Sequence, residues 1–175
     1  LLSVCLSQLT QVVHRQSTWK GLTAAVAAGH LRSAGVSNFN VRQMEELVEE
    51  GQGYTPAPVA NNQFQYNPWA PDWKHDCVAY CQKHNIAVTA WSSLAGTTMQ
   101  SAKAFTVETI KAIADKNSIS VAQVLLRWAV QKGLVVIPGT SNPKHMAENL
   151  AVYSFELSSS DMSAIDALSS DPIAK

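Results

Sequence analysis

Charge is scarce and balanced in this sequence. Lys, Arg, Asp and Glu together make up 15% of its 175 residues, and the formal net charge at pH 7 is zero. Without an excess of positive charge, the chain lacks the broad attraction that binding to nucleic acids or anionic membranes requires. Long apolar runs are missing too: the run at 133–138 is far shorter than the roughly 20 residues of a membrane-spanning helix. We therefore expect neither a nucleic-acid partner nor a membrane span.

Cysteine is also rare. An odd count of three argues against a disulfide framework and for a reducing compartment, the cytoplasm or an organelle interior. The apolar N-terminal stretch has no initiator Met and no basic flank, so we expect the inside of a domain and not a signal peptide. The missing Met suggests that more of the chain precedes residue 1.

What the sequence does contain is a repeated alternation of short apolar runs and amphipathic stretches, in a chain long enough for a single domain, 1–175. Short apolar runs are typical of parallel strands that are buried on both faces. The predicted strands are Leu1–Leu6, Arg32–Val36, Ala60–Phe64, Ile86–Ala90 and Val135–Pro138. This alternation predicts a parallel sheet with right-handed crossovers, either open or closed into a barrel.

End signals place helices between the strands, because Ser, Thr and Asn cap N-termini and Gly or Asn ends helices. The predicted helices are 18–29 capped by Thr18, 41–50 capped by Asn40, 72–84 ended by Asn85, 107–115, 121–132 opened by a Ser120/Gln123 capping box, 143–150 capped by Asn142, and 160–168.

Polar but uncharged side chains lie at or just after the ends of four of the predicted strands. They are Ser37 and Asn38, Gln63, Trp91 and Ser92, and the turn Thr140-Ser141-Asn142. The amides suit a carboxamide, the indole offers a flat face for stacking, and the turn leads into a helix N-terminus, which favours an anion. No carboxylate or metal-ligand set accompanies them. A neutral planar amide ligand and a phosphate fit this set better than acid–base hydrolysis does.

These strand ends resemble the aldo-keto reductase family, in order, from about residue 18 to 168. The resemblance rests on Gly-Val-Ser-Asn-Phe at 35–39, Asn-Gln-x-x-x-Asn-Pro at 62–68, Ala-Trp-Ser-x-Leu at 90–94, and Ile-Pro-Gly-Thr-Ser at 137–141 with Glu148-Asn149 after it. It implies an α/β fold: an incomplete (β/α)8 TIM barrel in which this chain supplies parallel strands four to eight. It also implies a nicotinamide cofactor, NADP(H) or NAD(H), across the strand ends.

The resemblance assigns roles residue by residue. Ser37, Asn38 and Gln63 match positions that hold the nicotinamide carboxamide, Trp91 matches the aromatic residue that stacks on the ring, and Ser92 matches a pyrophosphate contact. Thr140 and Asn149 match positions near the adenosine phosphate and the adenine. The cofactor set is completed by neighbouring residues of the same motifs, Leu94, Ser141 and His145.

Two departures from the family pattern concern the cofactor. Gly139 stands where many NADPH-using members have lysine, and His145 stands where they have arginine. Losing fixed positive charge there weakens the expected discrimination for the 2′-phosphate. The sequence therefore leaves the choice between NADP and NAD open.

The larger departure concerns catalysis. The family reduces carbonyls by hydride transfer, with a tyrosine proton donor supported by lysine, aspartate and histidine. The first three strands carry the aspartate, tyrosine and lysine, and this chain starts at about the fourth. No tyrosine here (Tyr54, Tyr66, Tyr80 or Tyr153) matches the donor. His14 is a weak candidate for the histidine; it is interpreted as a loop residue, with the histidine position shifted into 5–8.

Several residues have a structural interpretation beside a functional one. His75, Cys77, Cys81 and His84 suggest zinc, but cysteines on one helix more often belong to the core. Met44 and Trp128 are predicted to be core residues, and Glu45, Glu46, Glu49 and Glu50 a solvated face that allows an ionic contact. Trp69 and Trp73 either border a substrate pocket or pack a loop, and packing is favoured.

Strands four to eight alone would leave two barrel edges unpaired. The chain is thus expected to be part of a longer reductase, one half of a split barrel completed by another polypeptide, or a degenerate reductase. A degenerate reductase would act as a structural or interaction subunit whose open edge other subunits cover. The first two explanations give an NAD(P)H-dependent carbonyl reductase, and the third gives a pseudoenzyme. For the 175 residues alone, catalysis is not expected, because an oriented proton donor contributes about 10²–10⁴-fold in rate.

Overall fold

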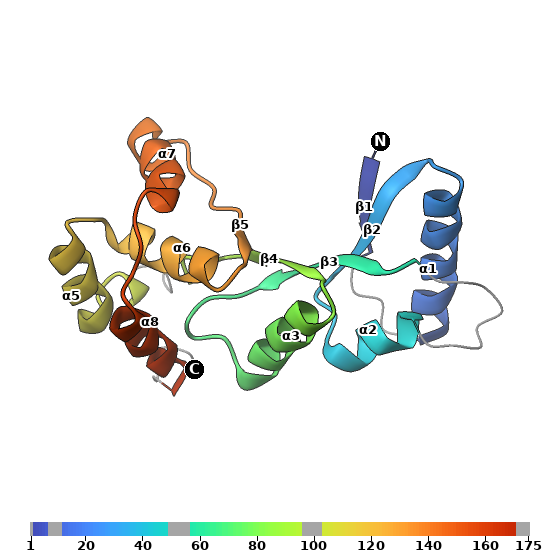
Figure 1. Ribbon diagram of the computed structural model, residues 1–175, viewed down its shortest axis with the longest axis horizontal. Helices are drawn as coiled ribbons and strands as arrows, with labels where there is room; N and C mark the ends of the chain where they lie inside the picture. The colour runs from blue at the N-terminus through green and yellow to red at the C-terminus, as the bar shows by residue number, and fades with distance from the viewer. Residues whose placement is uncertain (1, 7–11, 49–56, 96–102, 171–175) are drawn as a thin grey trace. The chain divides into compact units, whose positions relative to one another are not determined.

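The structure, a computed structural model, describes residues 2–6, 12–48, 57–95 and 103–170 (Figure 1). It divides into two compact units. The first comprises Leu1–Phe64 and Trp73–Thr89, and the second comprises Gln65–Asp72 and Ala90–Lys175. Strands β3 and β4 contribute residues to both units.

The first unit is a parallel sheet with helices between its strands. Its elements are β1 (Leu2–Leu6), α1 (Val12–Ala27), β2 (Leu31–Ser37), α2 (Val41–Val48), β3 (Val59–Gln65), α3 (Asp72–Lys83) and β4 (Ala87–Trp91). The strands lie in chain order, and both β1–β2 and β2–β3 pair in parallel. In β2, Ala34, Gly35 and Val36 are buried in succession, as in a strand covered on both faces. The predicted α/β fold with parallel strands is thus confirmed.

Two helices of this unit end as predicted. Gly29 after α1 and Asn85 after α3 both adopt left-handed backbone, with φ values of 75° and 56°. In each case the next amide donates back to the last turn: His30 N to Ala25 O at 3.0 Å, and Ile86 N to Cys81 O at 2.8 Å. These hydrogen bonds satisfy carbonyls that a helix end otherwise leaves without partners.

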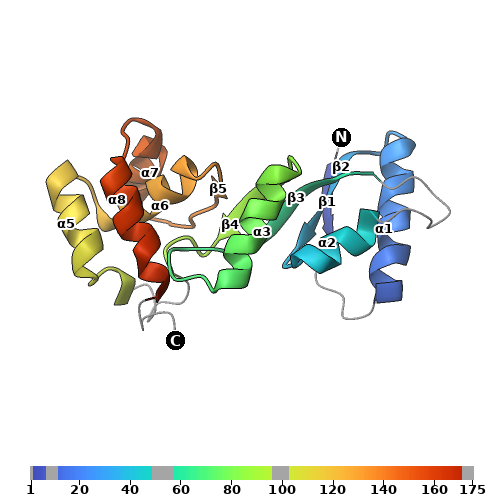
Figure 2. The ribbon, with the colours of Figure 1, turned by 60° about the horizontal axis from the view of Figure 1, so that its bottom comes forward.

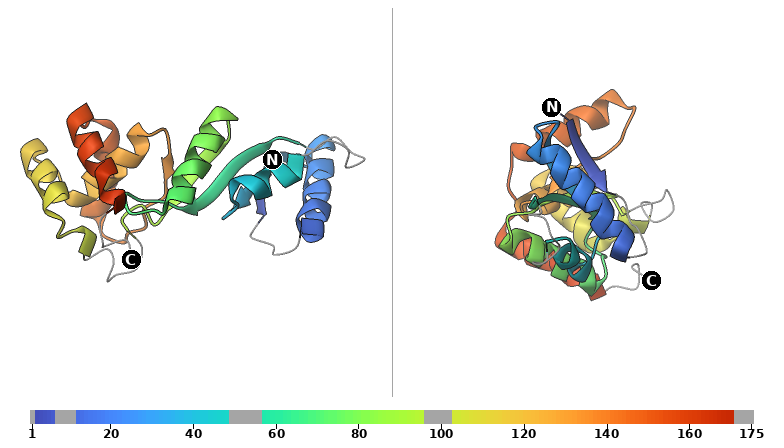
Figure 3. Two further views of the ribbon diagram at one scale, coloured as in Figure 1. Left: turned by 90° about the horizontal axis from the view of Figure 1, so that it is seen from below. Right: turned by 90° about the vertical axis from the view of Figure 1, so that its right-hand side faces the viewer.

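Helix α1 begins six residues before the predicted cap at Thr18. The reason is tertiary packing: Arg15 and Trp19, one turn apart, are both buried, and Arg15 forms an ion pair with Glu46 of α2. Figure 3 shows α1 beside β1. Glu46, predicted to be solvated, is largely buried by this pair, whereas Glu45 is exposed. Glu49 and Glu50 lie outside the described residues.

Cys77, Cys81 and Met44 belong to the core of the first unit, as predicted. All three are buried. The Cys77 thiol faces the Phe39 carbonyl oxygen at 3.8 Å, and the Cys81 sulfur lies 3.9 Å from the Met44 sulfur. On the same helix, His84 stacks on Tyr80 with a ring-centroid distance of 4.2 Å.

The second unit is mainly helical around the ends of β3 and β4. Its elements are β5 (Val135–Val136), α5 (Glu108–Asn117), α6 (Val121–Gln131), α7 (Pro143–Leu150), η1 (Ala151–Tyr153), α8 (Ser159–Asp166) and η2 (Ala167–Ser170). Strand β5 lies next to β4. Helix α5 contacts both α6 and α8, and α6 also contacts α7 (Figure 2). Strand β5 is shorter than predicted because Pro138 has no N–H to donate and Ile137 is half exposed.

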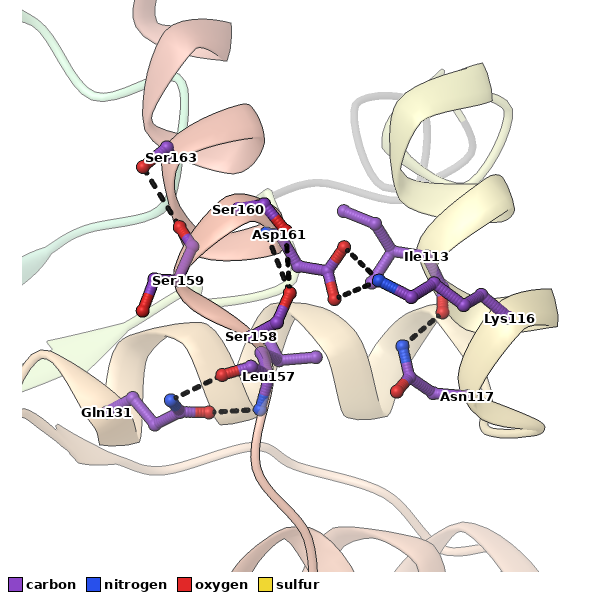
Figure 4. A network of polar contacts seen from close by, with 10 residues as sticks. All are labelled: Ile113, Lys116, Asn117, Gln131, Leu157, Ser158, Ser159, Ser160, Asp161 and Ser163. Carbon is purple, nitrogen blue, oxygen red and sulfur yellow. Dashed lines mark hydrogen bonds and ion pairs between the residues drawn. The ribbon is translucent and has the colours of Figure 1, made fainter.

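Caps and ion pairs fix the helices of this unit. The predicted Ser120/Gln123 capping box opens α6, and Asn142 caps α7 before Pro143. At the start of α8, Ser158 caps the Asp161 amide, and the Asp161 carboxylate accepts two 3.0 Å hydrogen bonds from Lys116 of α5 (Figure 4). The Gln131 side-chain amide donates to the Leu157 carbonyl oxygen and accepts from the Leu157 backbone N–H.

Trp128 is a core residue of this unit, as predicted. It is fully buried, stacks on Tyr66 with a centroid distance of 5.6 Å, and donates from Nε1 to Asp166 at 2.8 Å. Trp69 is buried as well, which agrees with a packing role, whereas Trp73 of the first unit is 46% exposed. Within the described ranges, every helix is too short or too polar to cross a membrane.

Candidate functional site

Three of the predicted cofactor residues meet at the carboxyl ends of β2 and β3 in the first unit. Ser37 is the register partner of Gln63, and the Asn38 amide N–H donates to the Gln63 carbonyl oxygen at 2.9 Å. Asn38 has a φ of 61°, a left-handed conformation that asparagine tolerates better than most residues. Its side-chain amide donates to the Ser37 hydroxyl at 3.1 Å. All three residues are partly exposed.

The predicted residues that follow β4 lie in the second unit. Trp91 is 38% exposed, and its carbonyl oxygen accepts from the Tyr66 amide at 3.2 Å. Ser92 is left-handed, with a φ of 57°, which ends the strand abruptly. The next residue, Ser93, is buried and donates to the Ala90 carbonyl oxygen at 2.8 Å. The turn therefore presents an indole face and the Ser92 hydroxyl at a strand end.

A pocket of about 190 Å³ in the second unit collects four more predicted residues. Its described lining residues are Leu94, Phe105, Ser120, Ala122, Gly139, Thr140, His145, Glu148 and Asn149. Leu94 belongs to one predicted motif, and Thr140, His145 and Asn149 belong to the segment of another; the fold brings all four to one cavity. Ser141 is exposed and is not among the described lining residues. Thr140 holds the turn before α7 by accepting from the Asn142 amide at 3.1 Å.

Sequence patterns missed the apolar part of this pocket. Phe105 and Ala122 carry no motif, and Ser120 was interpreted only as a helix cap. Phe105 lies in the turn before α5, and Ser120 and Ala122 lie at the start of α6, so the pocket joins segments that no local pattern connects. Glu148 stood in the motif beside Asn149, but its charge was not linked to the pocket.

The charge of the pocket is unusual for a phosphate site. Its described lining residues include the carboxylate of Glu148 and the imidazole of His145, but no lysine or arginine. Lys144, one turn from Glu148, is 80% exposed and lies 3.8 Å from that carboxylate. A Cβ at Gly139 would have nothing within 4 Å. The structure thus agrees with the expectation of little fixed positive charge.

Neither Tyr66 nor Tyr80 is placed as an accessible proton donor near these residues. Tyr66 is buried under Trp128, and burial, followed by the nearby Asp166 carboxylate, raises its pKa. Burial also raises the pKa of Tyr80, which lies on α3 against His84. Tyr153, after α7, is 69% exposed and lines a second pocket with Thr140 and Asn149, whereas Tyr54 lies outside the described residues.

The interpretation of His14 as a loop residue is wrong. His14 lies in the first turn of α1, is exposed, and accepts from the Ser17 hydroxyl through its backbone carbonyl at 3.2 Å. The early start of α1, fixed by Arg15, accounts for the difference. Of the alternative range 5–8, residues 5 and 6 end β1, whereas 7 and 8 lie outside the described residues.

Known proteins match this chain along most of its length. It is 39% identical over 157 residues to the NAD(P)H-dependent D-xylose reductase I,II of Candida tropicalis. That alignment covers 85% of this chain and 47% of the Candida protein. This chain is 36% identical over 156 residues to the glyoxal reductase of Bacillus subtilis, with 89% and 52% covered. The chain spans about half the length of these curated relatives.

A solved structure and a family model match this chain as well. A Gox0644 mutant in complex with NADPH superposes with a TM-score of 0.81 at 32% identity, over 96% of this chain and 59% of that one. The parallel α/β architecture matches part of its barrel. A model of the Aldo/keto reductase family matches residues 8–170. The chain belongs to the aldo/keto reductase family.

Proposed function

We propose that this chain supplies the cofactor-binding part of an NAD(P)H-dependent carbonyl reductase. Ser37, Asn38 and Gln63 hydrogen-bond the nicotinamide carboxamide, Trp91 stacks on the ring, and Ser92 contacts the pyrophosphate. Leu94, Thr140, Ser141, His145 and Asn149 hold the adenosine end. When bound, the dinucleotide supplies the hydride for carbonyl reduction.

The pocket that contains Leu94, Thr140, His145 and Asn149 carries this proposal. These residues come from three separated segments, after β4, after β5 and on α7, and line one cavity. Its mixture of apolar walls, hydroxyls and an amide suits an adenosine group, because ligand sites are mainly apolar with a few placed polar groups. The relative from C. tropicalis is named for NAD(P)H dependence, and a solved neighbour holds NADPH.

The proton donor for reduction is proposed to come from outside the described residues. Burial raises the pKa of Tyr66 and of Tyr80. Tyr153 on η1 is exposed and lines a pocket with Thr140 and Asn149, but it matches no proton-donor position of the family. The 175 residues alone are therefore expected to bind the dinucleotide and not to reduce carbonyls. The remainder of an eight-stranded barrel, on the same or another polypeptide, would supply the donor.

A second candidate, an interaction subunit that has lost catalysis, is favoured by one surface of the second unit. Five large apolar side chains are exposed around β5 and α7: Val135, Ile137, Met146, Leu150 and Tyr153. Three of them, Met146, Leu150 and Tyr153, line a pocket of about 390 Å³ whose described lining is mostly apolar and also includes Thr140 and Asn149. Exposed apolar clusters of this kind mark protein interfaces. We propose that the rest of a barrel covers this surface, whereas an interaction subunit would use it for a different protein.

Fluorescence titration of the chain with NADPH and NADH tests the cofactor proposal. Saturable quenching of tryptophan emission is expected, and Trp91→Leu should remove most of it. Trp73→Leu is the matched control, because Trp73 is exposed to a similar degree, 46% against 38%, and belongs to no proposed site. If the folded chain responds to neither dinucleotide, the reductase proposal fails and the interaction subunit becomes the better explanation.

A further inference from the structure

The turn that follows β4 needs support from outside itself. Ser92 and Ala95, neither of them glycine, both adopt left-handed backbone, with φ values of 57° and 71°. Residues with a Cβ are strained in this region and stay there only when their surroundings fix them. Within the turn, the Ala95 amide N–H donates to the Ser92 carbonyl oxygen at 3.0 Å. The Ser93 hydroxyl donates to the Ala90 carbonyl oxygen at 2.8 Å as well, but neither bond links the turn to another strand end.

The second contact to the Ser92 carbonyl oxygen comes from another strand end. The Asn67 side-chain amide donates to it from Nδ2 at 3.3 Å. The other side-chain atom of Asn67, Oδ1, accepts from the Trp69 amide N–H at 3.1 Å. Because a backbone N–H only donates and a carbonyl oxygen only accepts, these two partners fix which way the side-chain amide points.

Asn67 itself is held rigidly. Its residue exposure is 7%, and its own carbonyl oxygen accepts from the Ala70 amide at 3.0 Å. The preceding residue, Tyr66, donates from its backbone N–H to the Trp91 carbonyl oxygen at 3.2 Å and stacks on buried Trp128. Two successive residues after β3 thus hold the two successive carbonyl groups, of Trp91 and Ser92, that start the turn.

We propose that Asn67 is a positioning residue for cofactor binding: its side-chain amide holds the left-handed turn at Ser92 and so sets the direction of the Trp91 ring and the Ser92 hydroxyl. This inference rests on the proposed function for the role of Trp91 and Ser92. Asn67 touches no cofactor in this scheme. It acts only through the Ser92 carbonyl group.

Two substitutions separate the link to Ser92 from the local turn at 67–70. Asn67→Asp keeps an acceptor for the Trp69 amide but has no N–H to donate to Ser92, whereas Asn67→Ala removes both contacts. Both variants should raise amide hydrogen exchange at Ala95 about three- to tenfold, because each removes the support of the turn. If Asn67→Asp exchanges at Ala95 like wild type, the link to Ser92 is not what holds the turn, and the inference is overturned.

Gln131→Ala is the matched control. Gln131 is also an amide side chain that brackets backbone, donating to the Leu157 carbonyl at 3.1 Å and accepting from the Leu157 amide at 2.7 Å (Figure 4). Gln131→Ala should lower the melting temperature of the chain, because two hydrogen bonds to the Leu157 backbone are lost. Amide hydrogen exchange at Ala95 and dinucleotide affinity should stay unchanged. A change at Ala95 in this variant would mean that exchange reports general loosening, which also overturns the inference.

Affinity completes the test. If wild type binds NADPH, Asn67→Asp should raise the dissociation constant for NADPH by about three- to tenfold, whereas Gln131→Ala should leave it unchanged. Unchanged affinity in Asn67→Asp would contradict a positioning role. If wild type binds neither dinucleotide, the proposed function fails by itself, and exchange at Ala95 alone decides whether Asn67 holds the turn.

Discussion

Gly35 on β2 faces the backbone of Asn61 on β3 with no room for a side chain. A Cβ at Gly35 would lie 2.8 Å from the Asn61 carbonyl oxygen. Movement of the β3 backbone away from β2 is opposed, because the Asn61 side chain accepts a hydrogen bond from the Thr89 hydroxyl of β4 at 2.9 Å. Gly35 therefore sets how closely β2 and β3 approach, two residues before Ser37.

We predict that Gly35→Ala lowers the free energy of unfolding by about 1–3 kcal/mol, as overpacking of a tight interior does. Urea denaturation followed by circular dichroism measures it. Gly21→Ala is the control: Gly21 lies within α1, a Cβ there meets nothing within 4 Å, and alanine should stabilise the helix by about 0.5–1 kcal/mol. Equal responses of the two variants would show that the Asn61 contact does not matter.

The carboxylate of Asp161 should make stability depend on pH in the acid range. Hydrogen bonding with Ser158, and then the Lys116 ammonium, hold the pKa of Asp161 below its ordinary value of 3.8. A depressed pKa means that the unfolded chain takes up the proton first as pH falls. The stabilisation is therefore complete above about pH 5 and is lost as pH falls through 3.8 to the lower folded value.

We predict that Asp161→Asn lowers the unfolding free energy at pH 7 by about 1 kcal/mol, because it loses the charge that joins α5 to α8. The gap to wild type should shrink between about pH 5 and pH 2, measured by urea denaturation at several pH values. Glu108→Gln serves as the control, since Glu108 pairs with Lys111 on the surface and is 86% exposed. A gap that stays constant with pH would rule out the ionic contribution.

The thiols of Cys77 and Cys81 are predicted to be unreactive in the folded chain. Both are fully buried, and burial raises the pKa of each, that of Cys81 to about 12. A buried thiol that stays protonated is neither a nucleophile nor a ready metal ligand. Iodoacetamide at about pH 8 should leave both unmodified until denaturant is added, as peptide mass spectrometry can follow. Rapid labelling without denaturant would contradict the core assignment.

Much of the fold could be predicted because its signals are local. Gly29, Asn85 and Gly133 end helices through the left-handed backbone that their positions suggested, and Ser120 and Asn142 cap helices as their spacing indicated. The start of α1 could not be predicted in this way. It depends on the Arg15–Glu46 ion pair between residues 31 positions apart, which no local pattern reveals.

The candidate site likewise contains residues that local motifs identify and residues that only the folded chain reveals. Strand-end motifs identified Ser37, Asn38 and Gln63, which the register of β2 and β3 brings together. Phe105 and Ala122 could not be identified from the sequence because they are ordinary apolar residues, one before α5 and one on α6, that meet in a pocket only in the folded chain. Asn67 was visible within a motif, but its hydrogen bond to the Ser92 carbonyl requires the folded turn.

Cofactor choice should follow the charge of the pocket that contains Gly139. The side chains described around it include the Glu148 carboxylate and no lysine or arginine, so they offer a 2′-phosphate little attraction. A Cβ at Gly139 meets nothing within 4 Å, which leaves space for a cation. We predict that Gly139→Lys raises the affinity for NADPH relative to NADH by about two- to fivefold, as expected of a partly exposed ion pair.

Glu148→Gln should act in the same direction by removing negative charge, whereas Gly139→Met adds bulk without charge and should leave the ratio unchanged. Parallel fluorescence titrations with both dinucleotides give the ratio. A similar gain from Gly139→Met would assign the effect to packing, and no gain from Gly139→Lys would place the 2′-phosphate outside this pocket.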